Sequence, residues 1–359
     1  MPRSARKRSL GQYGGRGSTS DCCAPREPRH HRFLSQQVSH LTMAPCPSGH
    51  TSGQTGTWSD PSPHRSSFVA VNGVRLYCLD WGGSGPDLVL IHGANMSPHY
   101  FDDLAPALTD RFRVIAYARR GHGRSDPKGP FDNATLAEDL GGVMDALDIP
   151  RAHLAGHSMG GNEITAMAGT HPDRVDHLVY LDAAYDWGDP LGAAAFRSFP
   201  PHLTQSSPGV MASIDAYRPN FVEMLPAVRG PSLFEGWMRD TVVIQPDGTL
   251  RYTINASLGE SLFASLLSER RDYTRVHAPA LAIYADSFWD TQHGKPAHKA
   301  ENLAWEQKYL ARFRAESIER IRREMPGVQI LRVPGTHPDM LFTCRKGIVR
   351  AIRRFLGDR

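Results

Sequence analysis

The chain has 359 residues, of which 40% are hydrophobic and 22% charged, proportions typical of a globular protein. No apolar run approaches the length needed to cross a bilayer, so we expect no membrane partner. The net charge of +4 is concentrated in residues 1–66, which carry nine Lys or Arg against three Asp or Glu. The remaining chain is close to neutral, which gives no support to nucleic-acid binding.

Residues 1–66 are rich in Arg, Ser, Gly, Pro and His and lack apolar periodicity, so they predict a disordered basic extension. Cys22, Cys23, His30 and His31 stand in adjacent pairs without the two-residue separation of structural zinc sites, and we expect no metal site. The five cysteines do not form a disulfide framework, which favours a reducing, cytoplasmic location.

A regular pattern begins at residue 67. "FVAVNGVRLYCLDW" predicts two strands joined by Asn72-Gly73, and "DLVLIHG" predicts a strand buried on both faces. A helix-like stretch follows, and "RVIAYARRGHGRSD" predicts a strand that runs into a glycine-rich loop. "NATLAEDLGGVMDALDI" has helical apolar spacing, with Asp132 or Asn133 placed as its N-cap.

Strands and helices continue to alternate through a short strand before Ser158, a helix to about His171 and the strand "HLVYLD". The alternation stops between residues 187 and 274 and resumes with "PALAIYAD", a long charged helix and "VQILRVPG". Alternation of this kind implies a parallel sheet with helices on both faces. The interruption predicts a cap at 187–274, inserted between core segments 67–186 and 275–359.

The segment "HLAGHSMGGNEI" places Ser158 in a G-x-S-x-G pattern between a strand and a helix. A serine at such an elbow is held in a strained backbone, and the flanking chain passes so close that Cβ atoms at Gly156 and Gly160 would collide. Its hydroxyl is then exposed at the carboxyl end of the sheet. The N–H of Met159, at the helix start, would face a developing oxyanion.

These motifs, together with "LIHGANMS", "RRGHGRSD" and "VPGTHPDMLF", resemble those of the α/β-hydrolase superfamily over residues 67–359. The resemblance implies an eight-stranded, mostly parallel sheet with a helical cap over a Ser–acid–His site. The serine at the elbow disfavours haloalkane dehalogenase and epoxide hydrolase activity, since those enzymes have aspartate there. The order of the triad in the chain indicates His337 as the base. Ala94 is expected to complete the oxyanion hole, and Asn95 either adds a donor or caps a helix.

The acid of the triad remains open between several aspartates. The superfamily pattern after the seventh strand reads Ala285 to Phe288 here, so its usual aspartate position is Phe288 and Asp286 is displaced from it. Asp182 ends the sixth strand, and its carboxylate would emerge beside the nucleophile because neighbouring strands lie about 4.8 Å apart. We favour Asp182, with Asp286 as the alternative and Asp290 or Asp186 behind it.

The cap is rich in aromatic and Met side chains, which favours an apolar acyl or aryl group in the substrate. The predicted pocket residues are Trp187, Phe221, Trp237 and Phe288. The sequence thus predicts a serine hydrolase, a carboxylesterase, that needs no cofactor and acts on a small-molecule ester. An aminopeptidase, a C–C bond hydrolase, a perhydrolase or a non-catalytic ligand-binding member of the fold are the alternatives. The oligomeric state is left open.

Overall fold

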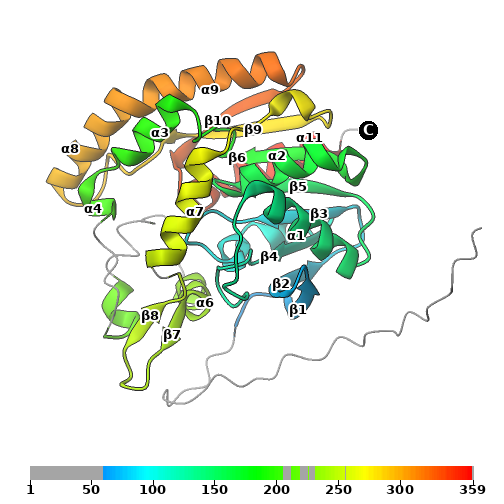
Figure 1. Cartoon of the computed structure of the whole chain (residues 1–359), viewed down its shortest axis with the longest axis horizontal. Helices are drawn as coiled ribbons and strands as arrows, with labels where there is room; N and C mark the ends of the chain where they lie inside the picture. Colours follow the sequence, from blue (N-terminus) through cyan, green and yellow to red (C-terminus); the bar gives the residue numbers. More distant parts are fainter. Residues whose placement is uncertain (1–59, 205–211, 219–224, 226–230, 255, 358–359) are drawn as a thin grey trace, which may run out of the picture. The chain divides into compact units, whose positions relative to one another are not determined.

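The computed structural model describes residues 60–204, 212–218, 225, 231–254 and 256–357. These residues form an eight-stranded sheet in the order β1-β2-β4-β3-β5-β6-β9-β10 (Figure 1). The strands are β1 (Arg65–Val71), β2 (Val74–Gly82), β3 (Asp87–Ile91), β4 (Arg113–Tyr117), β5 (Ala152–His157), β6 (Val175–Leu181), β9 (Ala280–Ser287) and β10 (Gln329–Thr336). Only β2 runs against its neighbours, so the predicted eight-stranded, mostly parallel sheet is confirmed.

Helices follow the strands of the core. The α-helices are α1 (Asn133–Ala146), α2 (Gly160–Thr170), α8 (Pro296–Trp305), α9 (Ala311–Glu324), α10 (Met340–Thr343) and α11 (Arg345–Gly357). Shorter turns are η1 (Pro98–Phe101), η2 (Ala105–Ala107), η3 (Pro172–Arg174), η4 (Tyr273–Arg275) and the π-helical turn η5 (Glu306–Leu310). None of the helices in the described ranges is long and apolar enough to cross a membrane.

The sheet separates two apolar layers. Along β3, Val89 and Ile91 pack into one layer while Leu88 and Leu90 pack into the other, because successive side chains point to opposite faces. The first layer also contains buried residues of α1, α2 and α9, and the second contains those of η1 and α11. Helices therefore cover both faces, and the strands read as continuous apolar runs for that reason.

Between β6 and β9 the chain holds elements that do not join the sheet. They are α3 (Pro190–Arg197), α4 (Pro201–Thr204), α6 (Pro231–Thr241), the two-stranded hairpin β7 (Val242–Ile244) and β8 (Leu250–Tyr252), and α7 (Ala256–Ser268). The hairpin turns at Pro246-Asp247-Gly248, where Gly248 has a φ of +83°. A Pro-Asp-Gly sequence is typical of such a turn, whereas the sequence analysis did not predict the two short strands. These elements occupy the interval in which the sequence predicts a cap.

The extension predicted for residues 1–66 overlaps the fold at its end. Strand β1 begins at Arg65, and the Ser62 hydroxyl donates a hydrogen bond of 2.9 Å to Asp102 while it accepts one of 3.1 Å from the Trp81 indole. Residues 60–66 therefore belong to the folded part of the chain, and the predicted boundary after residue 66 is wrong. Polar side chains make these contacts, and apolar periodicity cannot reveal them. Residues 1–59 lie outside the described residues.

Two helical predictions differ in detail from the structure. The helix-like stretch after β3 forms only the short turns η1 and η2, each with a proline in its first turn. The long charged helix is interrupted by η5, which separates α8 from α9. Of the two candidate N-caps for α1, Asp132 takes the role by accepting a 2.8 Å hydrogen bond from the Thr135 N–H.

Candidate active site

Ser158 lies in the tight turn between β5 and α2 and has a φ of +53°, a left-handed conformation that is rare for a residue with a side chain. A Cβ at Gly156 would lie 2.5 Å from the backbone of Gly160, and a Cβ at Gly160 would lie 2.5 Å from the carbonyl of Ile91. Both approaches are too close for a real side chain. The predicted reason for these two glycines is therefore confirmed.

His337 follows β10 and reaches the serine. Its Nε2 lies 2.8 Å from the Ser158 Oγ, and its ring stacks on Phe288 with a centroid distance of 4.0 Å and an interplanar angle of 10°. The backbone N–H of His337 also donates to the Phe288 carbonyl at 3.1 Å. Both the backbone and the ring of His337 are therefore held against the end of β9.

Asp182 follows β6 directly and lies on the far side of the imidazole from the serine. Its Oδ2 is 2.7 Å from the His337 Nδ1, and the side chain is fully buried. Its Oδ1 accepts hydrogen bonds from the Tyr185 hydroxyl at 2.9 Å and from the Ala285 N–H at 3.3 Å. The carboxylate is thus held by the loop that follows β6 and by strand β9.

The protonation states follow from these contacts. Burial by itself raises the pKa of Asp182, but the hydrogen bond from His337 and the nearby charges of His337 and Arg314 lower the pKa below its usual value. An ionised carboxylate only accepts hydrogen bonds, so the His337 Nδ1 must carry the proton. With the proton on Nδ1, the neutral form of the imidazole would present an unprotonated Nε2 to the Ser158 hydroxyl, and this is the form that can accept its proton.

The other candidate acids do not meet His337. Asp286 is exposed near the end of β9, and Asp290 pairs with His293 at 3.0 Å. Asp186 is buried in ion pairs with Arg270, at 2.7 Å, and Arg320. Among the four aspartates considered from sequence, the structure brings only Asp182 to the imidazole. Its role in catalysis stays a prediction.

The expected oxyanion donors flank the serine. Met159 is buried and immediately precedes α2, where N–H groups of the first turn have no acceptor within the helix. On the other side, a Cβ at Gly93 would lie 3.0 Å from that of Ser158, so the chain that leads into Ala94 runs directly beside the serine. Asn95 is exposed with a φ of +57°, a turn position.

His92 fixes this loop and was missed by the sequence reasoning. Burial, helped by the charges of Arg119 and His122, lowers the pKa of His92 well below its usual value, so the ring is neutral. Its Nε2 accepts a 3.3 Å hydrogen bond from the Arg119 N–H, which leaves the proton on Nδ1 to donate to the Gly93 carbonyl at 2.8 Å. The two hydrogen bonds of the His92 ring therefore fix the orientation of the Gly93 carbonyl in this loop.

Tyr185 and Arg314 form a second layer that the sequence also did not reveal. The Arg314 Nε donates to the Tyr185 hydroxyl at 2.8 Å, and that hydroxyl donates to Asp182. Arg314 belongs to α9 and is 5% exposed, so a buried cation supports the carboxylate through one tyrosine. Arg314 is far from Asp182 in sequence, and the helical pattern places it among the charged residues of its helix. The sequence therefore gives no sign of its link to Asp182.

The predicted pocket residues divide between two places. Trp187 and Phe288 are 5% and 3% exposed and lie 5.6 Å apart, centroid to centroid, within a cluster of aromatic rings. Trp237 belongs to α6 and lies edge-on to Tyr100 at 6.4 Å. Phe221 lies outside the described residues. Most of the surface of the three described residues is used in packing, and their contact with substrate stays a prediction.

Comparison with known proteins bears on the core of the chain. A family model described as "alpha/beta hydrolase fold" matches residues 86–200. "Putative carbamate hydrolase RutD" of Caulobacter segnis is 37% identical over 124 residues, 33% of this chain and 45% of that protein. "Non-heme chloroperoxidase CPO-A1" of Kitasatospora aureofaciens is 38% identical over 115 residues, 31% of this chain and 42% of that protein. The chain spans less than half the length of these relatives.

The likeness in structure extends further than the likeness in sequence. The crystal structure of E-2-(acetamidomethylene)succinate hydrolase matches 82% of this chain and 100% of its own chain, with a TM-score of 0.65. The sequence identity is 22%, so this match shows a shared fold and nothing more. An eight-stranded sheet with a strained serine after its fifth strand defines an α/β protein of the hydrolase type. The chain belongs to the α/β-hydrolase superfamily.

Proposed function

We propose that the chain is a serine hydrolase that cleaves carboxylic esters of apolar acyl or aryl groups through an acyl-enzyme. One observation carries the proposal: the Ser158 Oγ, the His337 imidazole and the Asp182 carboxylate form a continuous line of hydrogen bonds of 2.8 and 2.7 Å. That arrangement activates a serine hydroxyl that is otherwise a weak nucleophile.

The chemistry follows from the proton positions. The Ser158 Oγ attacks the ester carbonyl while its proton moves to the His337 Nε2, and the buried Asp182 stabilises the imidazolium that forms. The N–H groups of Met159 and Ala94 hold the negative oxygen of the tetrahedral intermediate. Collapse expels the alcohol, which takes the proton from Nε2. Water then attacks the acyl-enzyme in the same way and releases the acid.

The preference for an apolar group rests on the surroundings of the imidazole. Phe288 stacks on His337, and Trp187 and Phe199 lie 5.6 and 5.9 Å from Phe288, so an aromatic wall adjoins the base. Such a wall favours apolar groups, but an extra methylene is worth only about 1–3 kcal/mol. We therefore expect a broad optimum over short to medium acyl chains.

Labelling with a fluorophosphonate probe tests the nucleophile. The purified protein should be labelled, and Ser158→Ala should abolish both labelling and hydrolysis of p-nitrophenyl esters while circular dichroism stays unchanged. The matched control is Ser268→Ala at an exposed position of α7, which should keep both signals. Equal labelling of Ser158→Ala would refute the assignment.

Substrate preference separates the proposed esterase from its alternatives. The values of kcat/KM should be compared over p-nitrophenyl esters of increasing chain length, an amino-acid p-nitroanilide and a macrocyclic lactone. Faster cleavage of the anilide would indicate an aminopeptidase, and activity on the lactone alone would indicate a cap shaped for one bulky ligand. Full labelling without turnover of any ester would indicate a ligand-binding protein.

A further inference from the structure

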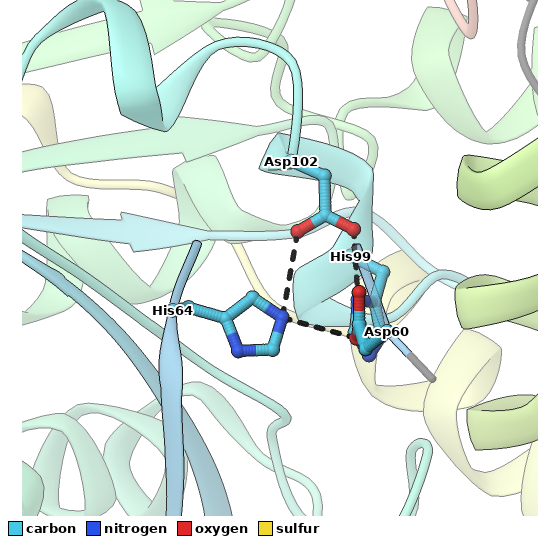
Figure 2. Close-up of side chains that lie close together, drawn as sticks. All are labelled: Asp60, His64, His99 and Asp102. Carbon is cyan, nitrogen blue, oxygen red and sulfur yellow. Dashed lines mark hydrogen bonds and ion pairs between the residues drawn. The ribbon is translucent and has the colours of Figure 1, made fainter. Parts of the chain in front are cut away.

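We propose a binding site for one divalent transition-metal ion of the zinc class, separate from the serine site and formed by four side chains: Asp60, His64, His99 and Asp102 (Figure 2). The inference goes beyond the proposed hydrolase function. Asp60 and His64 belong to the segment before β1, His99 belongs to η1, and Asp102 directly follows η1.

The four side chains converge on one small volume. One ligand atom from each residue lies within 4.8 Å of every other. Figure 2 shows the imidazole of His64 pointing between the carboxylates of Asp60 and Asp102, with His99 behind Asp60 in this view and close to both carboxylates. Two imidazoles and two carboxylates directed at one point form a ligand set that suits zinc and similar ions, whereas Mg²⁺ and Ca²⁺ prefer oxygen ligands alone.

The nitrogen–oxygen distances in the cluster are close to those of a tetrahedral centre. Bonds of about 2.0–2.2 Å from a tetrahedral ion to its ligands place neighbouring ligand atoms about 3.3–3.6 Å apart. The His64 Nε2 lies 3.2 and 3.8 Å from the oxygens of Asp60 and Asp102. The His99 Nδ1 lies 3.6 Å from the Asp60 carboxylate, and it forms a 2.9 Å hydrogen bond with the Oδ2 of Asp102, which the ion would replace. The four nitrogen–oxygen distances therefore lie on either side of the expected value.

His64 supplies an independent indication of a bound ion. Its side chain is 5% exposed, and neither of its ring nitrogens has a hydrogen-bond partner among the described residues. Its Nε2 is close to two carboxylates without being aligned for a hydrogen bond to either. The contacts of the Nε2 with Asp60 and Asp102 are ion pairs only if the ring is protonated. A neutral ring requires another partner for its buried nitrogen, and an ion between the imidazole and the two carboxylates would satisfy it.

Neighbouring groups hold the ligands in position. The His99 Nε2 lies 3.4 Å from the carboxylate of Asp240, whose Oδ2 is buried without a hydrogen-bond partner. The ring can therefore keep its proton on Nε2 when an ion displaces the proton that Nδ1 shares with Asp102. Metal-binding histidines usually direct their other N–H to such a carboxylate. Ser62 donates its N–H to Asp60 at 2.9 Å and its hydroxyl to Asp102 at 2.9 Å.

The arrangement indicates a structural ion and not a catalytic one. Four protein ligands complete a tetrahedral shell, whereas catalytic zinc keeps a position open for water. The ion would fasten the segment before β1 to η1, and through Asp240 both would be linked to α6. Tyr100, next to His99, donates a 3.0 Å hydrogen bond to the Pro338 carbonyl beside the triad base, so loss of the ion would loosen a support of the serine site.

Metal content of the full chain tests the site directly. Protein purified without a metal-affinity step, supplied with Zn²⁺ and then dialysed, should retain about one zinc per chain by mass spectrometry of the elements. Co²⁺ added to chelator-treated protein should give the intense visible absorption of a tetrahedral complex. Zinc at about 100 times its Kd should raise the Tm of the chelated protein by about 4 °C.

Substitutions locate the ion. His64→Gln and Asp102→Asn should each weaken zinc binding at least about 100-fold, and Asp240→Asn should weaken it about 10- to 100-fold. The matched control is His293→Gln, because His293 and Asp290 form an exposed pair at 3.0 Å with the same three-residue spacing as His99 and Asp102. This control should bind zinc as the parent chain does.

The outcomes are distinguishable. The proposal is overturned if the parent chain retains no zinc, or if His64→Gln binds zinc as tightly as the parent chain does. Either result would mean that ion pairs from protonated histidines hold the cluster together. A variant with Cys22→Ser, Cys23→Ser, His30→Gln and His31→Gln should keep its zinc, and its loss would move the site to the N-terminal extension. If His64→Gln does not fold, Asp60→Asn takes its place in the comparison. This substitution removes the charge of a side chain that is 24% exposed.

Discussion

Replacing Asp182 with Asn tests the proposed triad at its most informative point. The Oδ1 of Asp182 accepts from two donors, the Tyr185 hydroxyl and the Ala285 N–H, so the amide oxygen of an asparagine must take that position. Its NH₂ group then faces the His337 Nδ1 at the 2.7 Å contact and can only donate. The imidazole is forced to carry its proton on Nε2, where it cannot accept the proton of the serine.

The expected loss is about 10⁴-fold in kcat, as when the corresponding aspartate of a serine-protease triad is replaced by asparagine, which is about 5 kcal/mol of transition-state stabilisation. The KM should change little, since the substrate does not contact this buried side chain. Rates would be measured with p-nitrophenyl butyrate, with the concentration of competent enzyme fixed by fluorophosphonate titration and the fold checked by Tm.

Asp286→Asn is the matched control, because Asp286 is exposed near the end of β9 and should leave kcat within about twofold. A value of kcat for Asp182→Asn within tenfold of the parent would refute the reasoning. So would a larger loss in Asp286→Asn, which would return the acid to the seventh strand of the sheet.

Three further predictions concern stability and support of the site. A histidine whose pKa is lowered in the folded state binds a proton more readily in the unfolded chain. The free energy of unfolding, measured in urea, should therefore fall on acidification from about pH 6.5 towards pH 3, by up to about 4 kcal/mol per pH unit for the three histidines together. The histidines responsible are His92, and His122 and His157 with pKa values of about 3, all lowered chiefly by burial. A flat profile over that range would contradict their burial. Gly156→Ala should destabilise the protein by at least about 3 kcal/mol because its Cβ meets backbone at 2.5 Å. Gly259→Ala in α7 should stabilise it by about 0.5–1 kcal/mol, because that Cβ would only reach van der Waals contact with Ile254 at 3.9 Å. Tyr185→Phe should lower kcat about tenfold at unchanged KM by releasing one side of Asp182, and an unchanged kcat would make that hydroxyl merely structural.

The sequence by itself determined the class of fold. Apolar runs such as "DLVLIHG" predict strands buried on both faces, and their alternation with helical periodicity leaves a parallel sheet as the consistent arrangement. The elbow around Ser158 was also readable, because glycine is required wherever a Cβ would meet backbone, and that requirement is local in the chain.

Only the tertiary structure shows which aspartate lies against His337, because the contact depends on which strand end lies beside that residue. Sequence spacing leaves Asp182 and Asp286 both possible, since β6 and β9 are neighbours in the sheet although an entire insertion separates them in the chain. The support of the acid by Tyr185 and Arg314 is hidden for the same reason.

The cluster around His64 shows most clearly which features the sequence alone does not predict. Asp60 and His64 belong to a segment whose composition predicts disorder, and His99 and Asp102 belong to a stretch that resembles an ordinary helix start. Neither pair is a metal motif, and no spacing in the chain connects them. The four side chains meet within 4.8 Å because the segment before β1 packs against the turn after β3, where the Ser62 hydroxyl donates to Asp102. Hydrophobic periodicity records which residues are buried in the core, but it carries no information about which polar groups come together at its edge.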